Sequence, residues 1–486
     1  MNKEIRVLEP KNIWNKFADL NAVPRPSKHE ERVIAFMVGF GKSLGLETTK
    51  DVVGNVIIRK PASGGMEDRK TVILQAHLDM VHQKNADTDF DFNTQGIGMY
   101  VDGDWVRAKG TTLGADNGLG VATIMALLES RDISHPPLEA LFTIDEETGM
   151  TGAKGLQGGL LKGDILLNLD TEDDDEIDIG CAGGIDITAK GLYEEVVLEG
   201  GYTAYKIGVK GLSGGHSGMD IHKGLGNANK IMNNLLILGQ EQLGLRISII
   251  DGGGLRNAIP RESTALVAIK VSDSNEFDKL FKDWGNDIKI EFAATEPNLK
   301  IVCEPAHLPK MVMDINDQLA LTNAVKNAHN GVYAMSSTMK DLVETSNNMA
   351  RVEVGAGRIA IACLTRSSVE EGKMELAKEL KDIFEKSGYE VTLSGDYPGW
   401  NPNPDSPILE LLRTKYIALF NEKPRVVACH AGLECGILGK NYPGVDMISF
   451  GPTIKGAHSP DERASISSLQ KFWKFILEIL QEIPQK

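Results

Sequence analysis

Three short apolar runs in the first part of the chain constrain its fold most strongly. They cover residues 71–76, 138–144 and 165–169, and each has the length of one buried strand. Between the first two, residues 118–129 place apolar side chains at helical spacing. Buried strands that alternate with helices are typical of an α/β domain with a mixed, largely parallel sheet.

The pattern returns near the C-terminus, where residues 445–450 predict a further strand and residues 465–483 a closing helix. The chain between these two regions has a different pattern, in which a mixture of predicted strands and helices occurs twice. One strand of this region is predicted at residues 288–293. We therefore expect a discontinuous α/β domain and an inserted α+β lid of two similar units. The expected boundaries are 1–186 and 400–486 for the domain, 187–399 for the lid, and about 187–285 and 286–399 for its two units.

Composition supports two domains and excludes several classes of protein. The 486 residues exceed the roughly 250–300 that one hydrophobic core usually serves. A formal charge of −16 argues against nucleic acid as a partner. Five scattered cysteines without a Cys-x-x-Cys pair favour a reducing compartment, and no apolar stretch is long enough for a membrane span. We expect a cytoplasmic protein with no nucleic-acid or membrane partner.

Each of the three early strands ends in residues that can bind a cation. His77 and Asp79 follow the first run, residues 145–147 (Asp-Glu-Glu) follow the second, and Asp170 follows the third. Because ligands in open α/β sheets bind at the carboxyl ends of the strands, these side chains are expected to converge. Asp116 precedes the helix at residues 118–129 and can point into the same crevice.

His458 supplies a further imidazole, because it follows the strand at residues 445–450 through a loop that can curl back. Imidazole and carboxylate ligands suit Zn²⁺, with Mn²⁺ or Co²⁺ possible, and the lack of thiolates argues against a structural zinc site. The acidic run at residues 172–176 lacks the spacing of a calcium-binding EF-hand loop and is interpreted as a solvated loop. The sequence therefore predicts a catalytic metal site.

These motifs resemble the signature of a family of two-zinc metallopeptidases. That family includes bacterial glutamate carboxypeptidase, acetylornithine deacetylase, succinyl-diaminopimelate desuccinylase and dipeptidases. The resemblance covers almost the whole chain, and residues 180–184, 214–218 and 430–434 are similar to the aminoacyl-histidine (Xaa-His) dipeptidase branch. It implies a phosphorylase/hydrolase-like zinc-peptidase catalytic domain with the double lid described above. The matching motifs are His77-x-Asp79, Gly114-Ala115-Asp116-Asn117, Asp145-Glu146-Glu147, Asp170 and His458.

The resemblance also implies a ligand for each position of a two-zinc centre. His77 and Asp170 would bind one zinc ion, Glu147 and His458 the other, and Asp116 would bridge both. Two adjacent cations lower the pKa of a shared water and polarise the carbonyl under attack. In the family, the peptide bond that follows the bridging aspartate is typically cis.

Five further residues receive roles from the same resemblance. Glu146 would be the general base, and Asp79 would orient His77 through the second ring nitrogen of that histidine. His216 would stabilise the oxyanion, while Asn257 and Arg366 would hold the C-terminal carboxylate of the substrate.

The expected reaction is hydrolysis of a dipeptide, and a preference for Xaa-His, including β-alanyl-histidine, rests on the resemblance alone. A deacylase or desuccinylase of N-acyl amino acids, with the same metals and base, is one alternative. A non-catalytic metal-binding relative is another, although the presence of Glu146 and Asp79 disfavours it. Because two units in one lid would mimic a dimer internally, a homodimer is possible but not required.

Overall fold

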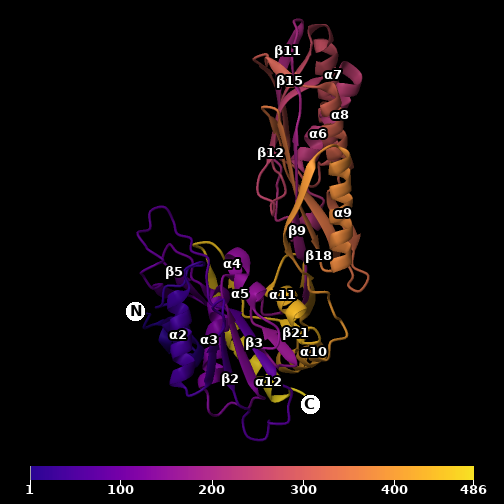
Figure 1. Ribbon diagram of the computed structural model, residues 1–486. Coiled ribbons are helices and arrows are strands. Elements are labelled where there is room, and N and C mark those ends of the chain that lie inside the picture. The colour runs from indigo at the N-terminus through magenta and orange to yellow at the C-terminus, as the bar shows by residue number, and fades with distance from the viewer. Residues whose placement is uncertain (1) are drawn as a thin grey trace. The chain divides into compact units, whose positions relative to one another are not determined.

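An eight-stranded mixed sheet organises the first of two units in the computed structural model, which describes residues 2–486 (Figure 1). This unit comprises Met1–Gly180, Pro402–Ala428 and Leu433–Lys486. Its strand order is β1-β2-β6-β3-β7-β21-β8-β20. The four adjacent strands β6, β3, β7 and β21 are parallel, whereas the β1/β2, β2/β6 and β21/β8 pairs are antiparallel. The strands are β1 (Glu47–Lys50), β2 (Val56–Lys60), β3 (Val72–His77), β6 (Leu138–Thr143), β7 (Ile165–Asn168), β8 (Glu176–Cys181), β20 (Arg425–Cys429) and β21 (Asp446–Ser449).

Both faces of this sheet are covered at its centre, since every residue of β3, β6 and β7 is buried. A smaller sheet of order β22-β23-β5-β4 lies in the same unit. The helices are α1 (Lys11–Leu20), α2 (Glu31–Ser43), α3 (Ala115–Glu129), α4 (Glu146–Gly149), α5 (Thr151–Gly155), α10 (Pro407–Phe420), α11 (Glu434–Asn441) and α12 (Ile466–Gln481), with η1 (Ile5–Val7). The smaller sheet contains β4 (Met99–Asp102), β5 (Trp105–Ala108), β22 (Ile454–Lys455) and β23 (Arg463–Ser465).

The second unit comprises Cys181–Asn401 and Cys429–Gly432, and a nine-stranded sheet forms its framework. Four long helices, α6 to α9, lie along one face of this sheet (Figure 1). The sheet strands are β9 (Gly183–Leu192), β11 (Tyr202–Lys210), β12 (Arg246–Gly253), β13 (Ser263–Lys270), β14 (Lys300–Ala306), β16 (Gly331–Met335), β17 (Val343–Gly355), β18 (Arg358–Ser367) and β19 (Glu390–Tyr397). The other elements are α6 (Ala228–Leu243), α7 (Ser274–Glu291), α8 (Ile315–Asn327), α9 (Glu370–Lys386), β10 (Glu195–Val197), β15 (Met311–Met313), η2 (Ile221–Lys223) and η3 (Val271–Asp273).

Two groups of four strands with the same internal order make up eight of the nine strands in the large sheet of the second unit, and β16 pairs with β17 beside them. The first group runs β14-β11-β13-β12, and the second runs β19-β9-β18-β17, so each has the order fourth, first, third, second along its own segment. The groups join where β12 pairs with β17. Because β9 precedes the first group in sequence but belongs to the second, the two similar units are nested rather than consecutive.

The structure corrects several predicted boundaries of this region. The predicted division after residue 285 falls inside α7, and the strand predicted at residues 288–293 is largely the last part of that helix. Buried Phe277, Trp284 and Ile288 mark one face of α7, which a local reading of residues 288–293 alone could not reveal. The predicted boundary after residue 186 passes through β9, and Cys429–Gly432 interrupts the predicted C-terminal segment 400–486.

The predicted strands of the first unit are present, with ends that shift by one or two residues. The predicted helix at 118–129 begins three residues earlier, at Ala115. Within residues 2–486, the helices are too short or too polar for any to span a bilayer.

Candidate metal centre and catalytic site

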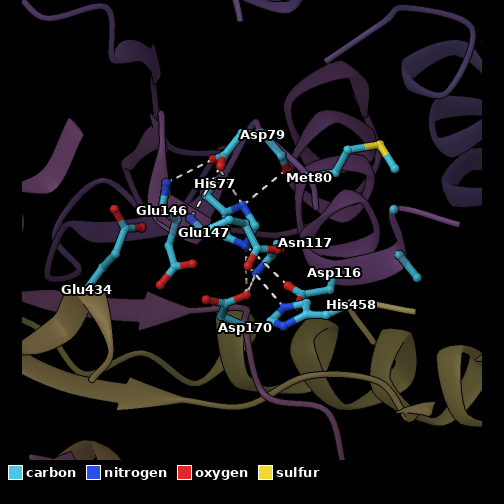
Figure 2. Close-up of polar contacts among 12 residues, drawn as sticks. His77, Asp79, Met80, Asp116, Asn117, Glu146, Glu147, Asp170, Glu434 and His458 are labelled. Atoms are coloured by element: carbon cyan, nitrogen blue, oxygen red, sulfur yellow. Dashed lines mark hydrogen bonds and ion pairs between the residues drawn. The ribbon is translucent and has the colours of Figure 1, made fainter. Parts of the chain in front are cut away.

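The five predicted metal ligands lie together at the carboxyl ends of the parallel strands (Figure 2). His77 is the last residue of β3, and Asp170 follows β7 by two residues. Glu147 lies in α4, which directly follows β6, and Asp116 lies in the first turn of α3. His458 comes from the loop between β22 and β23. Four of these residues thus come from the edge where parallel strands place their loops, and the fifth is brought there from far along the chain.

The ligand atoms form two sets of three that share Asp116. In the first set, His77 Nε2 lies 3.2 Å from Asp116 Oδ1 and 3.5 Å from Asp170 Oδ1. In the second, His458 Nε2 lies 3.1 Å from Asp116 Oδ2 and 3.0 Å from Glu147 Oε2. Each oxygen of Asp116 therefore faces a different imidazole, which is the arrangement that a bridging carboxylate requires.

The chemistry of this cluster fits divalent cations. Burial raises the pKa of both Asp170 and Glu147 above the ordinary range; the neighbouring histidines oppose this increase, and the charge of Asp116 adds to it. Glu147 Oε1 is buried without a hydrogen-bond partner. A group of largely buried acids beside two imidazoles, with an unsatisfied carboxylate oxygen, can be stabilised by bound cations, and nitrogen and oxygen ligands suit Zn²⁺, Mn²⁺ or Co²⁺.

Asp79 supports this cluster from the other side of His77. Its side chain is fully buried, and its Oδ1 lies 3.4 Å from His77 Nδ1. It also accepts hydrogen bonds from the Ser27 hydroxyl at 2.8 Å and from the backbone N–H groups of Glu146 at 3.0 Å and Glu147 at 3.3 Å. Asp79 therefore connects the end of β3 with the start of α4.

Glu146 differs from its neighbour Glu147 in what surrounds it. Its carboxylate points into the space beside Asp170 in Figure 2, and its side chain makes no hydrogen bond or ion pair with the residues that the structure describes. Burial raises its pKa well above the ordinary value. A carboxylate near the predicted ligands but unpaired with them has the placement that a general base needs.

Two residues of this site were not assigned roles from the sequence. Asn117 donates hydrogen bonds from Nδ2 to Asp170 Oδ1 and to the Leu169 carbonyl, and the Asp116–Asn117 peptide bond is cis, as the resemblance implies. Glu434 is fully buried, and its Oε2 accepts hydrogen bonds from Gln75 and Thr143 at 2.7 and 2.6 Å. Burial raises the pKa of Glu434 to about 8. The sequence gives no signal for this role of Glu434, because a single acid at the start of an apolar helix is equally typical of a residue that stabilises the helix N-terminus.

The three residues predicted to contact substrate lie in the second unit. The backbone N–H of Ser217, next to His216, donates to the Asn257 carbonyl at 2.8 Å. Arg366 reaches the same segment, because its Nε donates to Ser217 Oγ at 3.3 Å, and its Nη1 donates to the Tyr397 hydroxyl at 2.9 Å. The loop that carries His216, the Asn257 segment and Arg366 are thus linked by hydrogen bonds within one unit.

The local environments of His216 and Arg366 are informative. His216 Nδ1 accepts the backbone N–H groups of Gly218 and Met219 at 3.2 and 3.0 Å, so its proton is assigned to Nε2. Burial, followed by the charge of Arg366, lowers the pKa of His216 and favours the neutral ring. Arg366 is only 5% exposed, and no carboxylate among residues 2–486 lies within ion-pair distance of it. The site around Arg366 therefore favours an anion.

The fold and the cluster at the strand ends define a metal-dependent hydrolase. The chain belongs to the peptidase family M20/M25/M40, whose family model matches residues 73–482, and it is a metallopeptidase of that family.

Similar proteins include a cytosol non-specific dipeptidase of Escherichia coli strain K12, which is 44% identical over 483 residues and covers 99% of this chain and 100% of its own length. The crystal structure of an aminoacylhistidine dipeptidase from Vibrio alginolyticus superposes with a TM-score of 0.95 at 43% identity, covering 100% of this chain and 99% of that chain. Aminopeptidase PepT from Bacillus cereus shares the fold, with a TM-score of 0.61 at 16% identity, over 98% of this chain and 99% of that chain.

Proposed function

We propose that this protein is a cytoplasmic dipeptidase that hydrolyses dipeptides at a two-metal centre. The observation that carries the proposal is the pair of ligand sets that share Asp116, with Glu146 unpaired beside them. The dipeptidase assignment and the compartment draw on the names of the similar proteins from Escherichia coli and Vibrio alginolyticus.

The proposed metals are two Zn²⁺ ions, with Mn²⁺ or Co²⁺ as substitutes. His77 and Asp170 would hold one, Glu147 and His458 the other, and Asp116 both. When bound, a pair of such cations polarises the scissile carbonyl and lowers the pKa of the attacking water. The mixed imidazole and carboxylate donors and the buried, unpartnered Glu147 Oε1 support this assignment.

Proton transfer is assigned to Glu146. It takes a proton from the attacking water and delivers it to the amine that leaves, which requires a carboxylate free of other partners. Asp79 keeps His77 oriented, because its backbone carbonyl lies 3.2 Å and its Oδ1 3.4 Å from His77 Nδ1, so that Nε2 faces the cluster.

Substrate binding is assigned to residues of the second unit. The planar guanidinium of Arg366 can bind a carboxylate at two points, and Asn257 is assigned to the same carboxylate. A neutral His216 with its proton on Nε2 is a hydrogen-bond donor, as stabilisation of an oxyanion requires. A substrate with a free C-terminal carboxylate follows from these roles, and Xaa-His dipeptides, including β-alanyl-histidine, are the proposed substrates.

A substrate panel combined with metal analysis tests the proposal. We expect about two Zn²⁺ per chain, hydrolysis of dipeptides including Xaa-His, loss of activity on chelation and recovery when Zn²⁺ is restored. N-acetylated and N-succinylated amino acids serve as the comparison. Hydrolysis of these compounds without hydrolysis of any dipeptide would replace the dipeptidase assignment by a deacylase.

A further inference from the structure

One buried carboxylate, that of Glu462, accepts hydrogen bonds from four successive backbone N–H groups. Its Oε2 lies 2.7 Å from the nitrogen of Leu113 and 2.9 Å from that of Gly114. Its Oε1 lies 2.7 Å from the nitrogen of Ala115 and 3.2 Å from that of Asp116. Glu462 is 2% exposed and thus devotes both oxygens to the segment that ends in the proposed bridging ligand.

This segment needs an external acceptor. Helices begin with N–H groups that have no partner within the helix, and the residue that precedes α3, Gly114, offers no side chain to accept them. Asp116 itself departs from helical geometry, with φ −80° and ψ 111°, so the first turn of α3 is irregular. Glu462 supplies the missing acceptors from a position 346 residues away in sequence.

Arg25 holds the same segment through its carbonyl groups. Arg25 is 1% exposed, and its guanidinium donates to the carbonyls of Gly114 at 2.5 Å, Leu78 at 3.1 Å and Asp79 at 2.9 Å. The segment that carries Asp116 is thereby connected to the end of β3, where His77 lies. The positive charge of Arg25 also offsets the negative charge of Glu462 in a buried environment.

Glu462 lies in the same loop as His458, which is one of the proposed metal ligands. The loop runs from the end of β22 at Lys455 to the start of β23 at Arg463, and it contains His458 four residues before Glu462. The His458 side chain is 53% exposed, and its Nε2 contacts the carboxylates of Asp116 and Glu147. The four hydrogen bonds of Glu462 connect this loop to the segment that carries Asp116.

We infer that Glu462 is a positioning residue that places Asp116 and His458 together before any cation binds. The inference rests on the proposed function, which identifies both residues as metal ligands. Glu462 acts by joining two distant chain segments, and each of its oxygens serves two N–H groups.

Zinc affinity of Glu462→Gln, measured by competition with a chromophoric chelator, tests this inference. Glutamine keeps one acceptor oxygen but turns an NH₂ group toward two N–H donors, so half of the contacts are lost. We expect zinc affinity to fall about 10- to 100-fold, as is typical when a group that orients a ligand is removed. We also expect kcat to fall while KM for a dipeptide changes little.

Glu139→Gln is the matched control. Glu139 is also buried, and its Oε2 accepts the backbone N–H groups of Lys162 and Gly163 at 2.7 and 2.9 Å, but it lies near the opposite, amino end of β6. We expect this variant to lose thermal stability in the metal-free form and to keep the zinc affinity of the wild type. If Glu462 had a purely structural role, Glu462→Gln would give the result expected of Glu139→Gln, which is lower thermal stability with the zinc affinity of the wild type.

Wild-type zinc affinity in Glu462→Gln would overturn the positioning role of Glu462 and leave the proposed metal centre intact. If Glu462→Gln does not fold, Glu462→Asp, which keeps both oxygens on a shorter side chain, is expected to bind zinc with intermediate affinity, and wild-type affinity there would overturn it equally. A wild-type chain that binds no Zn²⁺, Mn²⁺ or Co²⁺ would overturn the metal centre and the inference together.

Discussion

At the scale of single residues, adjacent acids have different environments. Glu147 pairs with His458, whereas the side chain of Glu146 makes no hydrogen bond or ion pair within residues 2–486. The sequence could predict that both lie at the end of a strand, because the apolar run before them is clear. The tertiary contacts of Glu434 and Glu462 could not be predicted, because their partners lie about 290 to 360 residues away.

Glu146→Gln tests the assignment of the base. Glutamine fills the same volume but cannot accept a proton, so we expect kcat for a dipeptide to fall by about 10²- to 10⁴-fold. Metal content measured by mass spectrometry should stay near that of the wild type. Glu147→Gln is the comparison and should lose bound metal. Equal turnover in Glu146→Gln and the wild type would refute the assigned base.

Arg366→Lys tests the carboxylate-binding residue. Lysine keeps the charge but loses the planar pair of donors, so we expect kcat/KM for a dipeptide to fall about 10- to 100-fold, mainly through KM. Activity on the C-terminally amidated dipeptide provides the control. The preference of the wild type for the free carboxylate should shrink in Arg366→Lys, and an unchanged preference would contradict the assignment.

At the scale of elements, the sequence predicts those helices and strands whose formation and burial depend on the side chains of the element itself. The runs that form β3, β6 and β7 are apolar on both faces, so their burial could be predicted without a partner strand. α7 shows the limit, because its final turns look like an alternating strand when they are separated from the buried face at Phe277 and Trp284. The acidic run at residues 172–176 is also more than a solvated loop, since Arg425 and Lys471 pair with it.

Asp178 in β8 gives a pH-dependent prediction for this element. Burial, followed by the charge of Glu176, raises its pKa to about 8, and its Oδ1 has no hydrogen-bond partner. Because the folded state holds the proton more tightly than the unfolded state, whose pKa is about 4, this group's contribution to stability falls as the pH rises from about 4 to 8. Asp178→Asn removes that titration.

We therefore expect the unfolding midpoint of Asp178→Asn to rise relative to that of the wild type as the pH increases from 5 to 8. The difference in unfolding free energy should grow by a few kcal/mol over this range, since each unit of pKa shift is worth about 1.4 kcal/mol. Calorimetry at several pH values measures it, and Asp405→Asn, at an exposed position, is the control. A difference that does not change with pH would contradict a buried, protonated Asp178.

At the scale of the whole molecule, the insertion was predictable but its topology was not. The pattern of predicted strands and helices changes after the third apolar run, at residues 165–169, and this change indicates that a second unit begins there. The nesting of one four-stranded group inside the other depends on β9 pairing with β18 and β19, a long-range choice that alternating side chains do not specify. The segment Cys429–Gly432 also belongs to the second unit, but it is too short to be recognised from its composition or its hydrophobic pattern.

Removal of metal should affect the two units differently. The acid and imidazole groups that can hold a metal among residues 2–486 all lie in the first unit. A cation that binds only the folded state stabilises it by about 4 kcal/mol at 1,000 times its Kd, so excess Zn²⁺ should raise the unfolding transition of that unit. Calorimetry with Zn²⁺ and with a chelator measures the shift. Asp178→Asn identifies the transition of the first unit at pH 8, and His458→Ala should reduce its response to Zn²⁺. A shift of the other transition alone would contradict a metal centre in the first unit.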